Sequence, residues 1–192
     1  MSGELQDAGA SSSTAPARPA STVILARPAE IGYEVFMVRR LARAAAFADV
    51  YVFPGGSVGE ADGVPDPIDG GFTVAEALDA LTARGGKPPS GAGDAIGFFR
   101  AAVRELFEEA GVLLARDPSG QMARIDPADA ARWDALRHEV QADRIDFVAT
   151  LRRERLTLDY RQLSYFSHWV TPVGEPRRFD TRFFVEIGRA HV

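Results

Sequence analysis

The chain of 192 residues contains no cysteine, which excludes disulfide bonds, zinc–thiolate sites and a cysteine nucleophile. It has no excess of positive charge, and its formal net charge of −5 argues against a nucleic-acid-binding surface. No apolar run approaches the roughly 20 residues that a membrane span needs, and the N-terminus lacks the basic start and apolar core of a signal peptide. We therefore expect a cytoplasmic protein without nucleic-acid or membrane partners.

The amino-acid composition is typical of a single globular domain. Hydrophobic residues make up 46% and charged residues 26% of the chain, and the length is sufficient for a sizeable core. Residues 1–20 are rich in Ala, Ser, Gly and Pro and predict a disordered tail. The domain itself is expected over residues 21–185. The Ala-, Arg- and Gly-rich composition hints at a bacterial source.

The hydrophobic pattern predicts strands at both ends of the domain and helices between them. Residues 21–27 and 33–39 are β-rich runs around a turn-like 28–32, which predicts a hairpin. The other expected elements are strands at 50–53, 163–170 and 179–185 and helices at 73–84, 95–110, 127–140 and 145–155. Expected helix caps are Thr73 with Glu76, Asp94 and Asp126. This order predicts the α/β (α+β) class, with a mixed sheet packed against helices.

The run RELFEEAGV at residues 104–112 is the strongest candidate for chemistry. Its acids Glu105, Glu108 and Glu109 stand at i, i+3 and i+4, so they share one face of the expected helix. Like charges this close repel one another, and a nearby arginine or a divalent cation such as Mg²⁺ would offset the repulsion. The alternative is an ordinary solvated helix face, since Arg104 and Glu108 form an i,i+4 pair.

A glycine-rich segment upstream is a second feature that suits a metal site. The expected strand at 50–53 stops at Pro54, Gly55 and Gly56, which is a strong turn signal. Glycine lets the backbone approach a ligand or ion closely, so the Gly56 carbonyl is a candidate metal ligand. A strand, a glycine turn and an acidic helix together indicate a diphosphate–metal site.

At these residues the chain resembles the Nudix hydrolase superfamily. Arg104, Glu105, Glu108 and Glu109 match the second half of its signature without a gap, and Gly56 matches the opening glycine. Asp62 stands where the signature has a glutamate, and a long run, residues 63–103, replaces its short spacer. Such an insertion is similar to that of the peroxisomal-type coenzyme A diphosphatases and their bacterial relatives. FPGG at 53–56, VLL at 112–114, WVTP at 169–172 and RRFDTRFF at 177–184 extend this resemblance over about residues 21–185.

The resemblance implies an α/β/α sandwich and an Mg²⁺- or Mn²⁺-dependent diphosphatase. Glu105, Glu108, Glu109 and the Gly56 carbonyl would hold the metal, with Glu105 also taking part in base chemistry and Arg104 holding the carboxylates in place. The small-molecule, nucleotide-type substrate would be coenzyme A or an acyl-coenzyme A. Alternatives are a nucleotide-sugar or dinucleotide diphosphatase and a non-catalytic Nudix-fold binding module. A homodimer is left open.

Three further expectations concern the substrate, the insertion and the end of the chain. Arg39, Arg43 and Phe53 are candidate substrate-binding residues, because arginine matches phosphate geometry; ordinary solvated charge is the alternative for the arginines. The insertion at 57–94 would form a lid or wall over the site or be a tolerated surface excursion. Residues 186–192 back-translate to a widely used sequencing adapter, so we expect a non-native tail on a C-terminally truncated domain.

Overall fold

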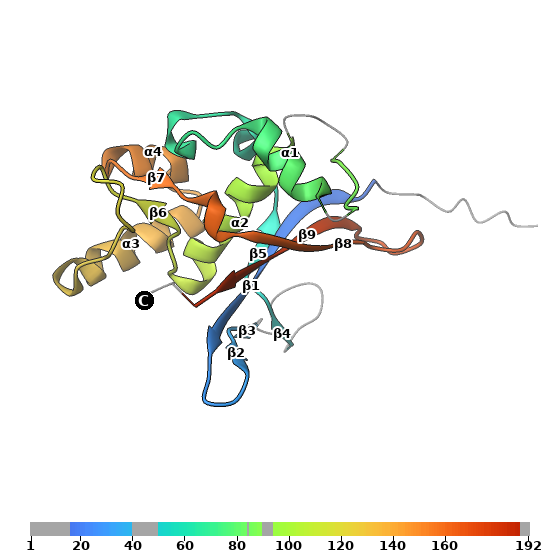
Figure 1. Ribbon diagram of the computed structural model, residues 1–192, viewed down its shortest axis with the longest axis horizontal. Coiled ribbons are helices and arrows are strands. Elements are labelled where there is room, and N and C mark those ends of the chain that lie inside the picture. The colour runs from blue at the N-terminus through green and yellow to red at the C-terminus, as the bar shows by residue number, and fades with distance from the viewer. Residues whose placement is uncertain (1–15, 40–49, 84, 90–93, 189–192) are drawn as a thin grey trace, which may run out of the picture.

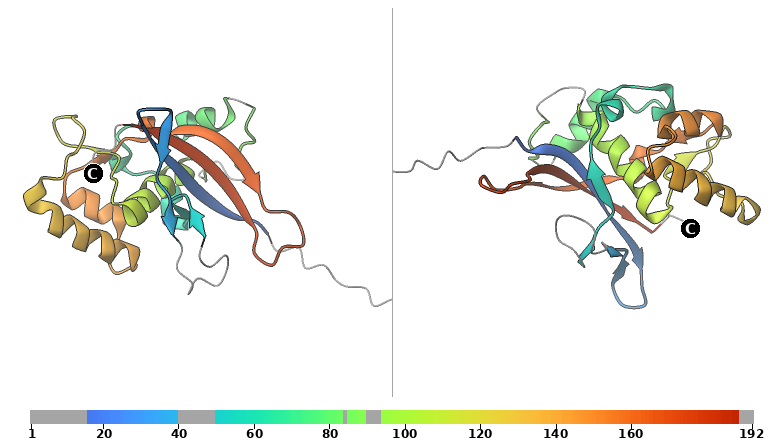
Figure 2. Two further views of the ribbon diagram at one scale, coloured as in Figure 1. Left: turned by 90° about the horizontal axis from the view of Figure 1, so that it is seen from below. Right: turned by 180° about the vertical axis from the view of Figure 1, so that it is seen from behind.

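The computed structural model describes residues 16–39, 50–83, 85–89 and 94–188 (Figure 1). Its central sheet has the strand order β2-β1-β9-β8, and β5 also pairs with β1. β1 and β9 run parallel while the other pairs are antiparallel, so the sheet is mixed. The strands are β1 (Arg18–Pro28), β2 (Tyr33–Val35), β5 (Gly55–Ser57), β8 (Ser164–Val170) and β9 (Phe179–Ile187). β1, β9 and β8 lie side by side as one curved layer (Figure 2).

The helices surround α2 (Asp94–Ala110), which packs on the sheet against β1 and β5. α3 (Ala130–Gln141), α4 (Phe147–Arg153) and a small pair of strands, β6 (Ala115–Arg116) and β7 (Thr157–Leu158), gather on one side of it (Figure 1). α1 (Val74–Thr82) contacts α2 and β8. A second small pair is formed by β3 (Val38–Arg39) and β4 (Tyr51–Val52), and the 3₁₀ helices are η1 (Glu60–Gly63), η2 (Pro67–Asp69), η3 (Pro127–Asp129) and η4 (Tyr160–Gln162). No helix in these described ranges is both long and apolar enough to cross a membrane.

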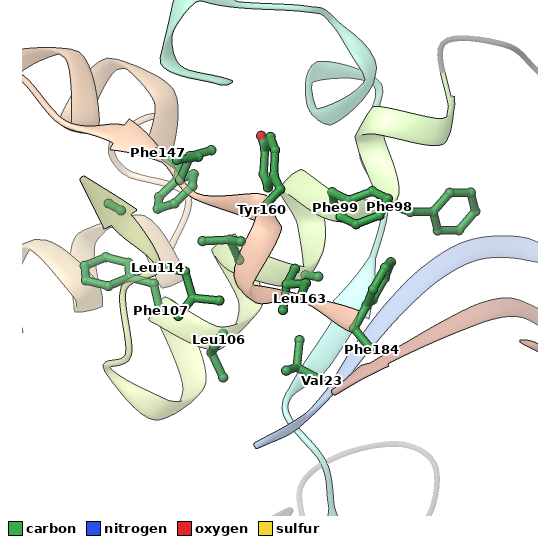
Figure 3. Packing of buried hydrophobic residues seen from close by; sticks show 14 of the residues in the cluster. Val23, Phe98, Phe99, Leu106, Phe107, Leu114, Phe147, Tyr160, Leu163 and Phe184 are labelled. Carbon is green, nitrogen blue, oxygen red and sulfur yellow. The ribbon is translucent and has the colours of Figure 1, made fainter. Parts of the chain in front are cut away.

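The core forms because the apolar residues of α2 repeat every three to four positions. Phe98, Ala102 and Leu106 are buried along one stripe and belong to the same core cluster as Val23 of β1 and Phe184 of β9. Figure 3 shows these two strand residues pointing toward the helix. Because the stripe takes one side of α2, the charged residues of its last two turns are left on another side, half-buried.

Most of the expected elements are confirmed, with shifted ends. The hairpin forms between β1 and β2, but the run 33–39 breaks into β2 and β3, which belong to different sheets. The helix expected at 127–140 is observed as η3 followed by α3, and the helix expected at 145–155 is α4. Asp126 caps η3, because its side chain accepts a hydrogen bond from the amide of Ala128. The expected tail at 1–20 overlaps the start of β1 at residues 18–20, and the expected non-native tail overlaps β9, which runs through Ile187. The α/β class and the mixed sheet are confirmed.

α1 begins with the capping box expected from the sequence. The Thr73 hydroxyl accepts from the Glu76 amide at 3.1 Å, and the Glu76 carboxylate accepts from the Thr73 amide at 2.8 Å. We expect Thr73→Ala to lower the free energy of unfolding by about 1 kcal/mol, because the helix loses its cap. Urea denaturation would measure this, and Thr73→Ser, which keeps the hydroxyl, should retain most of the stability. Equal losses in both variants would contradict the assignment.

A buried ion pair anchors the long segment between β5 and α2. Arg100 of α2 exposes 1% of its surface and donates two hydrogen bonds of 2.8 Å to the carboxylate of Asp69 in η2. The Tyr160 hydroxyl donates to the same carboxylate at 2.6 Å, and Arg100 also donates to the carbonyls of Ala61 and Val64. This part of the insertion is therefore packed against α2.

Candidate active site

The acidic helix meets the expected glycine turn at two points, although the structure places Gly55 and Gly56 at the start of β5 and paired with β1. A Cβ on Gly56 would lie 2.7 Å from Oε2 of Glu105, so any larger residue at this position would have to displace the carboxylate. One residue earlier, the Gly55 amide donates to Oε2 of Glu109 at 3.0 Å. Gly55 is itself needed for close approach, because a Cβ there would lie 2.8 Å from the Thr22 Cα in β1. The first two residues of β5 thus lie directly against two carboxylates of α2.

Arg104 connects the remaining carboxylates of the site. Its Nη1 donates to Glu105 Oε1 at 2.8 Å and to Glu108 Oε1 at 3.1 Å, and its Nη2 donates to the Ser57 carbonyl at 2.9 Å. Burial alone would lower the pKa of this guanidinium, but its bonds and charge attraction to Asp62 and its acidic neighbours raise the pKa above its ordinary value. Arg104 therefore stays charged and separates two acids that would otherwise repel each other.

Asp62 is a site residue whose role the sequence did not reveal. It is buried in η1, accepts from Nη2 of Arg104 at 3.1 Å and also accepts from the Gly59 amide at 2.9 Å. The sequence marked it only as a departure from the family glutamate. The signal that could have identified it was its position, six residues after Gly56, where the signature has a glutamate. Aspartate and glutamate can both pair with an arginine such as Arg104. The insertion contributes to the site through this residue.

Glu105 is the carboxylate most altered by its surroundings. Burial, together with the charges of Glu108 and Glu109, raises its pKa to about 7 against the lowering effect of Arg104. A buried carboxylate beside two like charges is costly to keep ionised, so a cation at this position would relieve that cost.

The acids and the glycine turn form a donor set suited to a hard divalent cation. Mg²⁺ is usually held by one or two carboxylates together with substrate phosphates and water. Glu105 beside Gly56 and Glu109 on Gly55 supply oxygens of this kind. Within the described ranges, no three His, Cys, Asp or Glu side chains gather closely enough to enclose a metal ion by themselves. The two carboxylates beside β5 would thus leave positions of such an ion to substrate and water.

The structure describes two of the three predicted substrate-binding residues. Phe53 is half-buried directly before the glycine turn, close in the chain to Gly56. Arg39 ends β3 and is exposed, and Arg43 lies outside the described residues. Arg137 of α3 was not predicted, yet its Nη1 donates to the Glu108 carbonyl at 2.8 Å. Its polar helical surroundings gave no signal that set it apart from other surface arginines.

Comparisons with known proteins agree with this geometry. A family model described as the NUDT19 Nudix domain matches residues 8–189. The chain is 27% identical over 177 residues to the acyl-coenzyme A diphosphatase NUDT19 of Xenopus laevis, covering 80% of this chain and 47% of the relative. It is 31% identical over 211 residues to the Gallus gallus protein of the same name, covering 88% and 54%. The chain thus spans about half the length of these curated relatives.

A solved structure supports the fold independently. The crystal structure of a Nudix hydrolase from Alicyclobacillus acidocaldarius superposes with a TM-score of 0.59 at 28% sequence identity. The match covers 92% of this chain and 75% of the other.

Proposed function

The chain belongs to the Nudix family, matching its NUDT19 Nudix domain, and we propose that it hydrolyses the diphosphate linkage of coenzyme A or an acyl-coenzyme A. The observation that carries the proposal is the convergence of Glu105 and Glu109 on the Gly55–Gly56 backbone. The names of the curated relatives support the choice of substrate. The products would be adenosine 3′,5′-bisphosphate and a 4′-phosphopantetheine compound.

Each site residue has a proposed role in this reaction. Glu105, Glu108, Glu109 and the Gly56 carbonyl would hold Mg²⁺ or Mn²⁺, which neutralises diphosphate oxygens and makes water a better nucleophile when bound. Oε1 of Glu105 accepts from Arg104, which leaves Oε2 to take the proton of the attacking water. Arg104 keeps Glu105 and Glu108 in place, and Asp62 keeps Arg104 in place. Phe53, Arg39 and Arg43 are proposed to contact the substrate.

The proposal also covers the setting of the reaction. We propose a small nucleotide-type substrate and keep the cytoplasm as the expected compartment, with a homodimer left open. The curated relatives come from Xenopus laevis, Gallus gallus and Homo sapiens, so they lend no support to the bacterial source expected from composition.

Product release from coenzyme A, ADP-ribose and a dinucleotide tests the proposal. Each substrate would be assayed with Mg²⁺, with Mn²⁺ and with EDTA on protein whose folding is verified by circular dichroism. We expect hydrolysis of coenzyme A that depends on the added metal and stops with EDTA. Preference for ADP-ribose or the dinucleotide would replace the substrate assignment, and no turnover of any substrate by folded protein would favour a binding module.

Gly56→Ala should remove activity through the position of Glu105. The new Cβ would overlap the Glu105 carboxylate, so we expect kcat to fall by about a hundredfold or more, as for other losses of positioned charge. Gly59→Ala, three residues further along, is the matched control, because its Cβ would meet Asp62 at an ordinary contact distance of 3.6 Å. Steady-state kinetics on both variants would check this. Similar rates for Gly56→Ala and Gly59→Ala would contradict the close contact.

A further inference from the structure

A cavity of about 870 Å³ opens at the C-terminal end of α2. Its walls come from the last turn of α2, the chain between β6 and η3, and the first turns of α3. Most of the lining is apolar and includes Phe107, Ala110, Leu113, Ile125, Trp133 and Leu156. Pockets of about 300–1,000 Å³ with such linings are typical sites for small ligands.

The cavity shares Glu109 with the candidate active site. Glu109 lines it, and the carboxylate of the same residue accepts from the Gly55 amide in the glycine turn. Arg137 also lines it and holds the Glu108 carbonyl. A substrate whose diphosphate lies at the acids would therefore lie next to this cavity, with only Glu109 of α2 between the two.

The lining selects which end of an acyl-coenzyme A would enter. One side of the diphosphate carries a nucleotide with a further phosphate, and the other carries a pantetheine arm that ends in an apolar acyl chain. The charged lining residues Arg124 and Arg137 are balanced by Asp117 and Asp134, with Glu109 adding a negative charge, so the cavity offers no net attraction for a phosphate. Its aromatic and aliphatic walls suit the acyl end.

We propose that this cavity binds the acyl-pantetheine arm of an acyl-coenzyme A, with the acyl chain against Phe107, Leu113 and Trp133. The inference rests on the proposed function for the identity of the substrate, and it assigns the chain-length preference to these walls. Burial of each methylene contributes about fourfold to affinity. Affinity should therefore rise along a series of acyl chains until the cavity is filled.

A binding measurement tests the site without turnover. The chain has two tryptophans, of which Trp133 lines the cavity and is buried, whereas Trp169 is 63% exposed on β8. In Trp169→Phe protein with EDTA, Trp133 is the only fluorescent tryptophan. We expect octanoyl-, decanoyl- and dodecanoyl-coenzyme A to change its emission with increasing affinity, and free coenzyme A to bind at least tenfold more weakly than the dodecanoyl form. Equal affinity for all four ligands, or a response to adenosine 3′,5′-bisphosphate alone, would overturn the proposal.

Two neighbouring alanines provide a matched pair of variants. Ala130 and Ala131 are both exposed in the first turn of α3, but only Ala130 lines the cavity. A new aspartate is compatible with either position, because negative charge is favourable near a helix N-terminus. We expect Ala130→Asp to weaken dodecanoyl-coenzyme A binding about tenfold and Ala131→Asp to leave it within twofold of the parent protein. Equal effects in the two variants would contradict the site.

The outcomes separate this inference from the proposed function. Chain-length-dependent binding without hydrolysis of any substrate would keep the cavity assignment and refute the diphosphatase. Suppose instead that coenzyme A and its acyl derivatives are hydrolysed with the same kcat/KM whatever the acyl length, and that Ala130→Asp leaves kcat/KM unchanged. That result would keep the diphosphatase and refute the cavity assignment.

Discussion

Glu105→Gln is expected to lower kcat for coenzyme A hydrolysis by about a thousandfold. The substitution keeps the size and shape of the side chain beside Gly56 but removes the charge that would hold a cation and take a proton. Glu105 is buried next to two other acids, and burial raises its pKa to about 7. Loss of its charge therefore relieves repulsion, and we expect the variant to be no less stable than the parent protein.

Steady-state kinetics and thermal unfolding of the same preparation would test both parts of this expectation. Glu139→Gln is the control, because Glu139 is a glutamate of α3 that pairs with Arg144 away from the acids. It should leave both the rate and the unfolding temperature nearly unchanged. A Glu105→Gln rate within tenfold of the parent would remove Glu105 from the chemistry, whereas a collapsed unfolding temperature would make its role structural.

Local patterns were sufficient to predict the helices and the hairpin. The stripe through Phe98 and Leu106 has the period of a helix, and the capping box at Thr73 marks where α1 begins. The pairings of β1 with β5 and β9 were beyond reach, because no local pattern joins these strands and β9 lies far along the chain. The parallel register of β1 and β9 depends on the whole core, which no window of sequence describes.

The candidate site shows the same division between local and distant information. The spacing of Glu105, Glu108 and Glu109 placed these acids near one another on a helix, and the glycine pattern pointed to Gly56. The structure added Asp62 and Arg137, which reach the site from η1 and α3. Their side chains are of types common on any surface, so only the tertiary structure could select them.

Asp69→Ala is expected to cause the largest loss of stability, about 3–5 kcal/mol in the free energy of unfolding. The change leaves the buried Arg100 guanidinium without its carboxylate and removes the acceptor of the Tyr160 hydroxyl. It also removes the bond from the Asp66 amide to Asp69, at 2.8 Å, within the insertion. The segment around η1 should loosen as a result, and with it the contact between Asp62 and Arg104.

Urea denaturation of a double-mutant cycle would measure this coupling. Arg100→Met keeps an apolar stem without the charge, so Asp69→Leu combined with Arg100→Met should lose much less stability than the sum of the two single variants. Glu139→Ala, which breaks an exposed pair, should change stability little. Additive losses in the cycle would mean that the two residues act independently, and the insertion would then need another anchor.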